Sequence, residues 1–145
     1  RDQREKLEAL ALVSAPALVS GNDLALVDYA KIVKPLNPTA LWAEPLVSSR
    51  LLEYELWARV HARRLGPSHG DMVRALLGRV ALLELAPPVL VRALEPFPVP
   101  VRTLDALHLA SLDFLRTHGQ TVRLASYDER LLTVARRLDI DVYAL

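Results

Sequence analysis

The sequence predicts an α/β protein in which helices cover both faces of a central parallel sheet, a three-layer α/β/α sandwich. The first observation is an alternation along the chain: short apolar runs typical of buried strands are separated by longer segments with apolar residues at helical spacing. The second is composition, because 52% of the residues are hydrophobic and 24% are charged, as in folded globular proteins. A length of 145 residues suits one domain with an adequate core.

Each expected strand is a short apolar run bounded by turn residues or acids. The expected strands are 24–27, 45–49, 122–127 and 141–145. A further run, 80–85, is long enough to be read either as a strand or as part of a helix. The sheet is expected to be parallel because helical segments separate these runs.

The expected helices follow the apolar periodicity and end at proline or glycine. They are 28–34, 50–65, 71–79, a short helix among the prolines of 86–102, 103–118 and 128–139. Gly66 and Pro67 are expected to end the helix over 50–65. For the helix over 103–118, we expect Thr103 as the N-cap and Gly119 as the stop.

We divide the chain into an N-terminal helical extension, residues 1–22, and one α/β domain, residues 23–145. The stretch RDQREKLEALAL, residues 1–12, has the pattern of a short amphipathic helix that ends near Pro16. Its role is left open.

Composition excludes several classes of function. The chain has no cysteine, which excludes disulfides and thiolate metal sites and favours a cytoplasmic location. A net charge of +1 gives no global field for nucleic acid, and no apolar run is long enough for a membrane span. The sequence also lacks the GxGxxG, GxxxxGK[ST], GxSxG and HExxH patterns of dinucleotide, P-loop, serine-hydrolase and zinc-protease sites.

Four acids fall where a parallel sheet places its ligand site, beyond the carboxyl ends of the strands. Asp28 and Asp128 each follow an expected strand, and Glu55 lies on the helix that strand 45–49 feeds. Asp105 lies in the first turn of the helix over 103–118, where the helix dipole favours an anion. Each also has a simpler interpretation: a helix N-cap for Asp28 and Asp128, a dipole partner for Asp105, and a solvated position for Glu55.

If the four acids converge, they need a neutralising cation. Two carboxylates roughly 5 Å apart repel by about 3 kcal/mol at an effective dielectric near 20. A ligand set of oxygens without cysteine favours Mg²⁺ or Mn²⁺ over zinc. An ion held in this way suits the hydrolysis of a phosphodiester.

Several stretches resemble PIN-domain ribonucleases, and most closely the VapC-type toxins. LDALHLAS and LASYDERLLTVARRLDIDV are similar to the C-terminal half of that family. SSRLLEYELWARVHARR resembles its segment with an acidic position, here Glu55, and LALVDYAKIVK resembles its opening strand with Asp28 as the first acid. The resemblance covers roughly residues 24–145 in order.

This resemblance implies a PIN-like fold for residues 23–145 and a Mg²⁺- or Mn²⁺-dependent endoribonuclease acting on RNA. The implied metal-binding and catalytic acids are Asp28, Glu55, Asp105 and, more peripherally, Asp128. It also implies the toxin of a type II toxin–antitoxin system, a homodimer, and inhibition by a cognate antitoxin protein.

The chain departs from the family pattern in one region. Ala30 and Lys31 replace the usual serine and alanine after the first acid, and the interval from Asp28 to Glu55 is short. A non-catalytic PIN-fold scaffold that binds a partner protein or RNA is therefore the alternative.

Other residues near the expected site have two interpretations each. His108 could touch substrate or metal, or it could form hydrogen bonds within the core. Ser126 and Thr103 are candidates for a supporting role. The candidates for binding RNA phosphates, each equally readable as a solvated charge, are Lys34, Arg50, Arg102 and Arg130.

Overall fold

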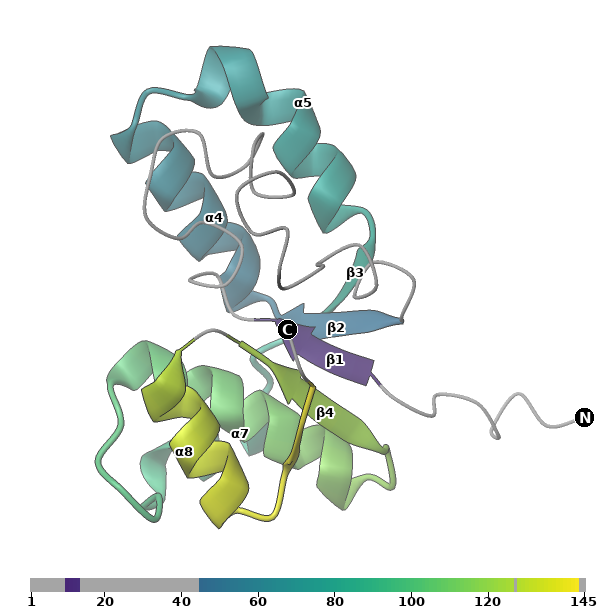
Figure 1. Cartoon of the computed structure of the whole chain (residues 1–145), viewed down its shortest axis with the longest axis vertical. Helices are drawn as coiled ribbons and strands as arrows, with labels where there is room; N and C mark the ends of the chain where they lie inside the picture. Colours follow the sequence, from purple (N-terminus) through teal and green to yellow (C-terminus); the bar gives the residue numbers. More distant parts are fainter. Residues whose placement is uncertain (1–9, 14–44, 127, 144–145) are drawn as a thin grey trace, which may run out of the picture.

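The described part of the chain forms one five-stranded parallel sheet. The computed structural model describes residues 10–13, 45–126 and 128–143, and the strand order is β3-β2-β1-β4-β5. Every neighbouring pair of strands is parallel (Figure 1). The strands are β1 (Leu10–Val13), β2 (Leu46–Ser49), β3 (Val80–Leu83), β4 (Val122–Ala125) and β5 (Asp141–Val142).

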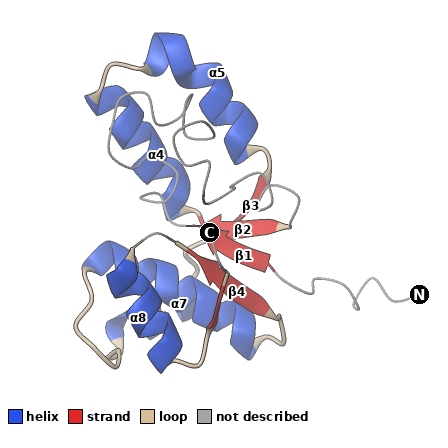
Figure 2. Ribbon diagram, in the orientation of Figure 1, coloured by secondary structure: helices blue, strands red, loops and turns tan. Residues whose placement is uncertain are grey.

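Helices lie on both sides of this sheet (Figure 2). They are α4 (Leu51–Ala62), α5 (Gly66–Leu77), α6 (Pro87–Leu94), α7 (Thr103–Thr117) and α8 (Glu129–Arg137). In the view of Figure 1, α4 and α5 lie above the strands, and α7 and α8 lie below them. The expected α/β class with a central parallel sheet is therefore confirmed.

The two faces of the sheet carry separate hydrophobic clusters because successive strand residues point to opposite sides. On β2, Leu46 belongs to the cluster that α4 and α5 cover, whereas Val47 belongs to the cluster of α7 and α8. On β4, Ala125 and Leu124 divide in the same way. Adjacent apolar residues, such as Leu46 and Val47 or Leu124 and Ala125, are typical of a strand buried on both faces.

The first described strand corrects the expectation for the N-terminal segment. Residues 1–12 were expected to be helical, but Leu10–Val13 form β1 between β2 and β4, with Ala11 opposite Leu46 and Leu12 opposite Leu124. Part of 1–22 therefore belongs to the sheet. Pairing on both edges outweighs a weak local helical preference here. The expected strand 24–27 and helix 28–34 lie outside the described residues.

The boundary between the expected helices 50–65 and 71–79 also differs from expectation, since α4 ends at Ala62 and α5 begins at Gly66. Gly66 and Pro67 do not end a helical region but form the first turn of α5, where proline is tolerated because its missing N–H has no intrahelical acceptor. The ambiguous run 80–85 is a strand over Val80–Leu83, and the proline-rich stretch holds the short helix α6 as expected.

The N-cap of helix α7 lies one residue earlier than expected. Arg102, with extended backbone angles, takes the N-cap position without a side-chain hydrogen bond, and Thr103 is the first helical residue. Thr103 is therefore not the N-cap. At the other end Gly119 has φ of +82°, the left-handed conformation that stops a helix, as expected. None of the described helices combines the length and apolar character that crossing a membrane would require.

Candidate functional site

The candidate acids lie at one edge of the sheet because of how the chain connects α7, β4 and α8. Residues 118–121 alone connect the end of α7 to the start of β4. The first turn of α7, with Asp105, therefore lies at the edge where the parallel strands end. Asp128 lies at this same edge, between the end of β4 and the start of α8.

Arg102 joins the two aspartates. Its Nε lies 3.4 Å from Asp105 Oδ2, and its Nη2 lies 3.7 Å from Asp128 Oδ2. The two carboxylates are largely buried, with side chains 16% and 18% exposed, whereas the arginine side chain is 69% exposed. Two carboxylates thus already share a single cation, which approaches them from the solvent side.

Asp128 has a structural role as well. Its Oδ1 accepts hydrogen bonds from the backbone N–H groups of Arg130 at 2.9 Å and Leu131 at 3.4 Å. Asp128 is therefore the N-cap of α8, which was its simpler interpretation. The backbone N–H of Asp128 donates to Ser126 Oγ at 3.0 Å, so Ser126 supports the turn. The second carboxylate oxygen remains directed toward Arg102.

Glu55 is held by His108 rather than by Arg102. The carboxylate Oε1 of Glu55 contacts the imidazole Nε2 of His108, and His108 Nδ1 lies 3.0 Å from Ser49 Oγ. The glutamate side chain is only 12% exposed, so the interpretation of Glu55 as solvated is wrong. The histidine, 2% exposed, forms hydrogen bonds within the core as expected.

The structure thus brings Asp105 and Asp128 together and places Glu55 beside the next turn of α7. Asp105 and His108 are three residues apart on that helix, on one face. Within the described ranges, no group of three or more His, Cys, Asp or Glu side chains could hold a metal ion. Asp28 and Lys34 lie outside the described residues.

Arg50 and Arg130, two of the residues predicted to bind RNA phosphates, differ in their surroundings. Arg50 is paired with two acids: its Nη1 lies 3.0 Å from Glu53 Oε2, and its Nε donates to Glu84 Oε1 at 3.0 Å. The hydrogen bond that Arg50 donates to Glu84, followed by the one it donates to Glu53, raises the pKa of Arg50 above its ordinary value. Arg130 is exposed at the start of α8.

Two cavities lie on either side of the loop that connects α6 to α7. The one beside the aspartates has a volume of about 400 Å³. Its lining includes the charged residues Arg102, Asp105 and Arg130 and the apolar residues Val99 and Val134. The larger one, about 690 Å³, lies between α6, the proline-rich loop and α7.

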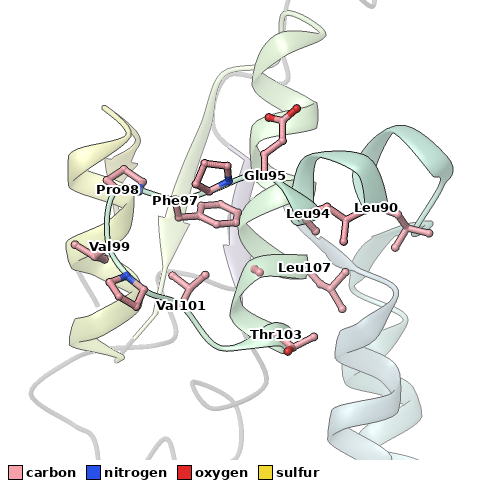
Figure 3. A pocket seen from close by; sticks show the side chains of 13 residues that line it. Leu90, Leu94, Glu95, Phe97, Pro98, Val99, Val101, Thr103 and Leu107 are labelled. Carbon is pink, nitrogen blue, oxygen red and sulfur yellow. The ribbon is translucent and has the colours of Figure 1, made fainter.

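Figure 3 shows this larger cavity with Thr103 at one end. Its lining contains none of the four candidate acids. We therefore place the candidate site at the smaller cavity, where charged and apolar groups meet.

Sequence reasoning missed Ser49 and the two acids that hold Arg50. Ser49 is fully buried at the end of β2. The available signal was a pair of serines at the end of a strand that begins with apolar residues. Glu84 gave no such signal, because its pairing with Arg50 depends on β2 and β3 lying side by side.

Comparison of the chain with protein-family models, with curated proteins and with solved structures found no match. What the fold itself defines is an α/β protein with short parallel strands and helices on both faces.

Proposed function

We propose that this protein is a metal-dependent endoribonuclease with a PIN-like fold, the toxin of a type II toxin–antitoxin pair. The observation that carries the proposal is the sharing of one guanidinium by Asp105 and Asp128 at the carboxyl edge of a parallel sheet. A space between two carboxylates that accepts one cation is suited to another. The resemblance of the surrounding sequence to PIN-domain ribonucleases supplies the substrate class.

The donors fit Mg²⁺ or Mn²⁺. Both are carboxylate oxygens, and Mg²⁺ is commonly bound by one or two carboxylates together with water and substrate phosphates. Arg102 would have to leave, and the cost is small, because its side chain is 69% exposed and ion pairs at the surface contribute about 0–1 kcal/mol. In this proposal Asp105 and Asp128 hold the ion, and Glu55 and Asp28 complete its surroundings.

The protein's own residues would then bind and orient the RNA. The chemistry that such an ion supplies is activation of water and stabilisation of charge on the phosphoryl oxygens. Arg102, once released from the aspartates, and Arg130 on the cavity wall provide cations for neighbouring phosphates. The apolar residues that line the cavity, Val99 and Val134, offer a surface for a nucleotide base.

The test is cleavage of single-stranded RNA in the presence of Mn²⁺ or Mg²⁺. We expect products with 5′-phosphate and 3′-hydroxyl ends, and a loss of at least about 100-fold in rate for Asp105→Asn and Asp128→Asn. Asparagine is also a good N-cap, so the second substitution removes charge while keeping the start of α8.

Asp139→Asn is the matched control. This residue is exposed with φ of +56°, a conformation that asparagine also tolerates. Cleavage that survives both test substitutions, or that EDTA does not stop, would contradict the proposal.

A second candidate is a non-catalytic PIN-fold scaffold that binds a partner protein or RNA. The pairing of Arg102 with both aspartates favours it, because one of their two negative charges is then balanced without a metal. In that case Mn²⁺ would not raise the melting temperature. For the nuclease, we expect a rise with Mn²⁺ that Asp105→Asn abolishes.

The proposal also includes a homodimer and an antitoxin partner. Exposed apolar side chains on adjoining helices support an interface: Leu90, Val91 and Leu94 on α6, and Leu104 on α7. Light scattering coupled to size-exclusion chromatography measures the mass in solution. We expect Leu94→Asp to convert a dimer to a monomer.

A further inference from the structure

A buried chain of hydrogen bonds connects three elements next to the candidate site. It consists of Ser49 at the end of β2, His108 on α7 and Glu55 on α4, and we call it the Ser49–His108–Glu55 array. Ser49 is 0% exposed. The proposed cleavage uses only Glu55 of this array, and Ser49 and His108 have as yet no part in it.

The chemistry of the groups assigns the direction of each hydrogen bond. An ionised carboxylate only accepts, so His108 Nε2–H donates to Glu55 Oε1. In a neutral imidazole the other nitrogen is then an acceptor, and the Ser49 hydroxyl donates to Nδ1. The carboxylate of Glu55 thereby selects the Nε2–H tautomer, and the Ser49 hydroxyl holds the other ring nitrogen.

The array does not have the arrangement of a nucleophilic site. Although serine, histidine and glutamate occur together, the serine hydroxyl is completely buried at the end of a strand, and a nucleophile must reach its substrate. The only member with notable exposure is Glu55. Whatever the array does beyond packing, it does through this carboxylate.

A glutamate on a helix surface ordinarily samples several rotamers. On α4, Glu55 lies between Leu52 and Leu56, which are both fully buried. The core therefore fixes the backbone of Glu55. The contact with His108 fixes the carboxylate end as well. Because His108 is one turn beyond Asp105 on the same face of α7, the histidine sets where Glu55 lies along the helix that carries Asp105.

We propose that His108 is a positioning residue for Glu55, and that the Ser49 hydroxyl holds the imidazole ring in the orientation this requires. The inference rests on the proposed function, in which Glu55 contributes to the surroundings of the divalent ion. Groups that orient metal ligands typically change metal affinity or activity by about 10- to 100-fold when removed. The array would act on Mn²⁺ binding without touching the ion or the RNA.

The test uses Ser49→Ala and His108→Gln, each with a matched control. The alanine variant removes the donor to Nδ1, and the glutamine variant keeps an N–H for Glu55 but loses the rigid ring. Ser68→Ala and His118→Gln are the controls, since both residues are exposed. Circular dichroism and thermal unfolding establish that each variant is folded.

Two readouts are independent of cleavage. Nitrogen-15 NMR of the imidazole is expected to show a protonated Nε2 and an unprotonated Nδ1 for His108, with the Nδ1 signal moved in Ser49→Ala. Titration with Mn²⁺, followed by electron paramagnetic resonance, is expected to show Kd about 10-fold weaker in the test variants. In cleavage assays kcat should fall, with KM for RNA unchanged.

The outcomes separate this inference from the proposed function. If folded Ser49→Ala and His108→Gln keep Mn²⁺ affinity and kcat while Glu55→Gln loses both, the positioning role is wrong and the nuclease proposal stands. A His108 protonated at Nδ1 and not at Nε2 also overturns the role. If Glu55→Gln changes neither quantity, both proposals fail at Glu55, and the aspartate substitutions decide whether a nuclease remains.

Discussion

Arg92 on α6 and Asp113 on α7 form an ion pair in which Nε lies 2.8 Å from Oδ2, and both side chains are about four-fifths buried, at 20% and 21% exposed. The guanidinium of Arg92 also lies over the ring of Phe97 at 4.4 Å, and Arg116 approaches Asp113 at 3.6 Å. This group attaches α6 and the start of the proline-rich loop to the middle of α7. It therefore fixes the helix that carries Asp105.

We expect Asp113→Asn to destabilise the protein by about 1–3 kcal/mol, because it leaves a largely buried arginine with only the more distant Glu95 carboxylate, at 4.0 Å, as a charged partner. Urea unfolding measures the change in free energy. Glu129→Gln is the comparison: its pair with Arg136 is 3.8 Å long and exposed, so the change should stay within about 0.5 kcal/mol. Equal effects would show that burial does not strengthen the Arg92–Asp113 pair.

The buried face of α7 gives a second prediction. Leu109 is completely buried against the sheet, and Leu104 on the same helix is 46% exposed. Leu109→Ala should cost about 2–5 kcal/mol through lost burial and the cavity it leaves, whereas Leu104→Ala should cost less than about 1 kcal/mol. Thermal and urea unfolding of the two variants test this, and a reversed order would contradict the orientation of α7.

Arg102 competes with a metal ion for the same two carboxylates. In Arg102→Gln we expect Mn²⁺ to bind about 5- to 30-fold more tightly, since two exposed pairs of about 0.5–1 kcal/mol each no longer oppose it. The affinity for RNA should fall, because a cation near the phosphates is lost.

Arg137→Gln, at the opposite end of α8 from Asp128, removes an equal charge and serves as the control. Titrations at fixed ionic strength measure both affinities. Unchanged Mn²⁺ binding in Arg102→Gln would mean that Asp105 and Asp128 do not receive the ion.

The Arg50–Glu84 pair predicts a dependence of stability on pH. The hydrogen bond from Arg50 lowers the pKa of Glu84 from its ordinary value of 4.5. A group with a lowered pKa in the folded state stabilises the protein above its unfolded pKa and loses this contribution as the pH falls through the folded value. The melting temperature of the wild type should exceed that of Glu84→Gln at pH 7, and the difference should shrink below pH 4.5. A difference that persists at low pH would contradict this linkage.

Local patterns in the sequence predicted most of the described elements. The strands at 46–49 and 122–125 and the helix over 103–117 were found because their apolar spacing, and Gly119 as a stop, depend on neighbouring residues alone. The central strand was not. The tetrapeptide LALV occurs at both 10–13 and 24–27. A strand was predicted only for the second copy, which lies outside the described residues. Identical tetrapeptides have the same intrinsic preference, and it is pairing with β2 and β4 that makes the first copy a strand.

The sequence predicted which acids lie at the candidate site but not which residues they contact. The acids at strand ends could be named because parallel strands end at one edge. Their partners could not: Arg102 reaches Asp128 from a distant part of the chain, and Ser49 meets His108 across the sheet edge. A sequence gives no signal for such contacts, because arginine, aspartate, serine and histidine are all also common at solvent-exposed positions.

The sequence alone determined the α/β class, the absence of cysteine chemistry and the residues available to a hard cation, because composition and periodicity are properties of the chain itself. The tertiary structure decided which carboxylates share a cation and which one is held by a histidine. Those choices depend on distances between side chains from different elements, and only the packing of helices on the sheet sets these distances.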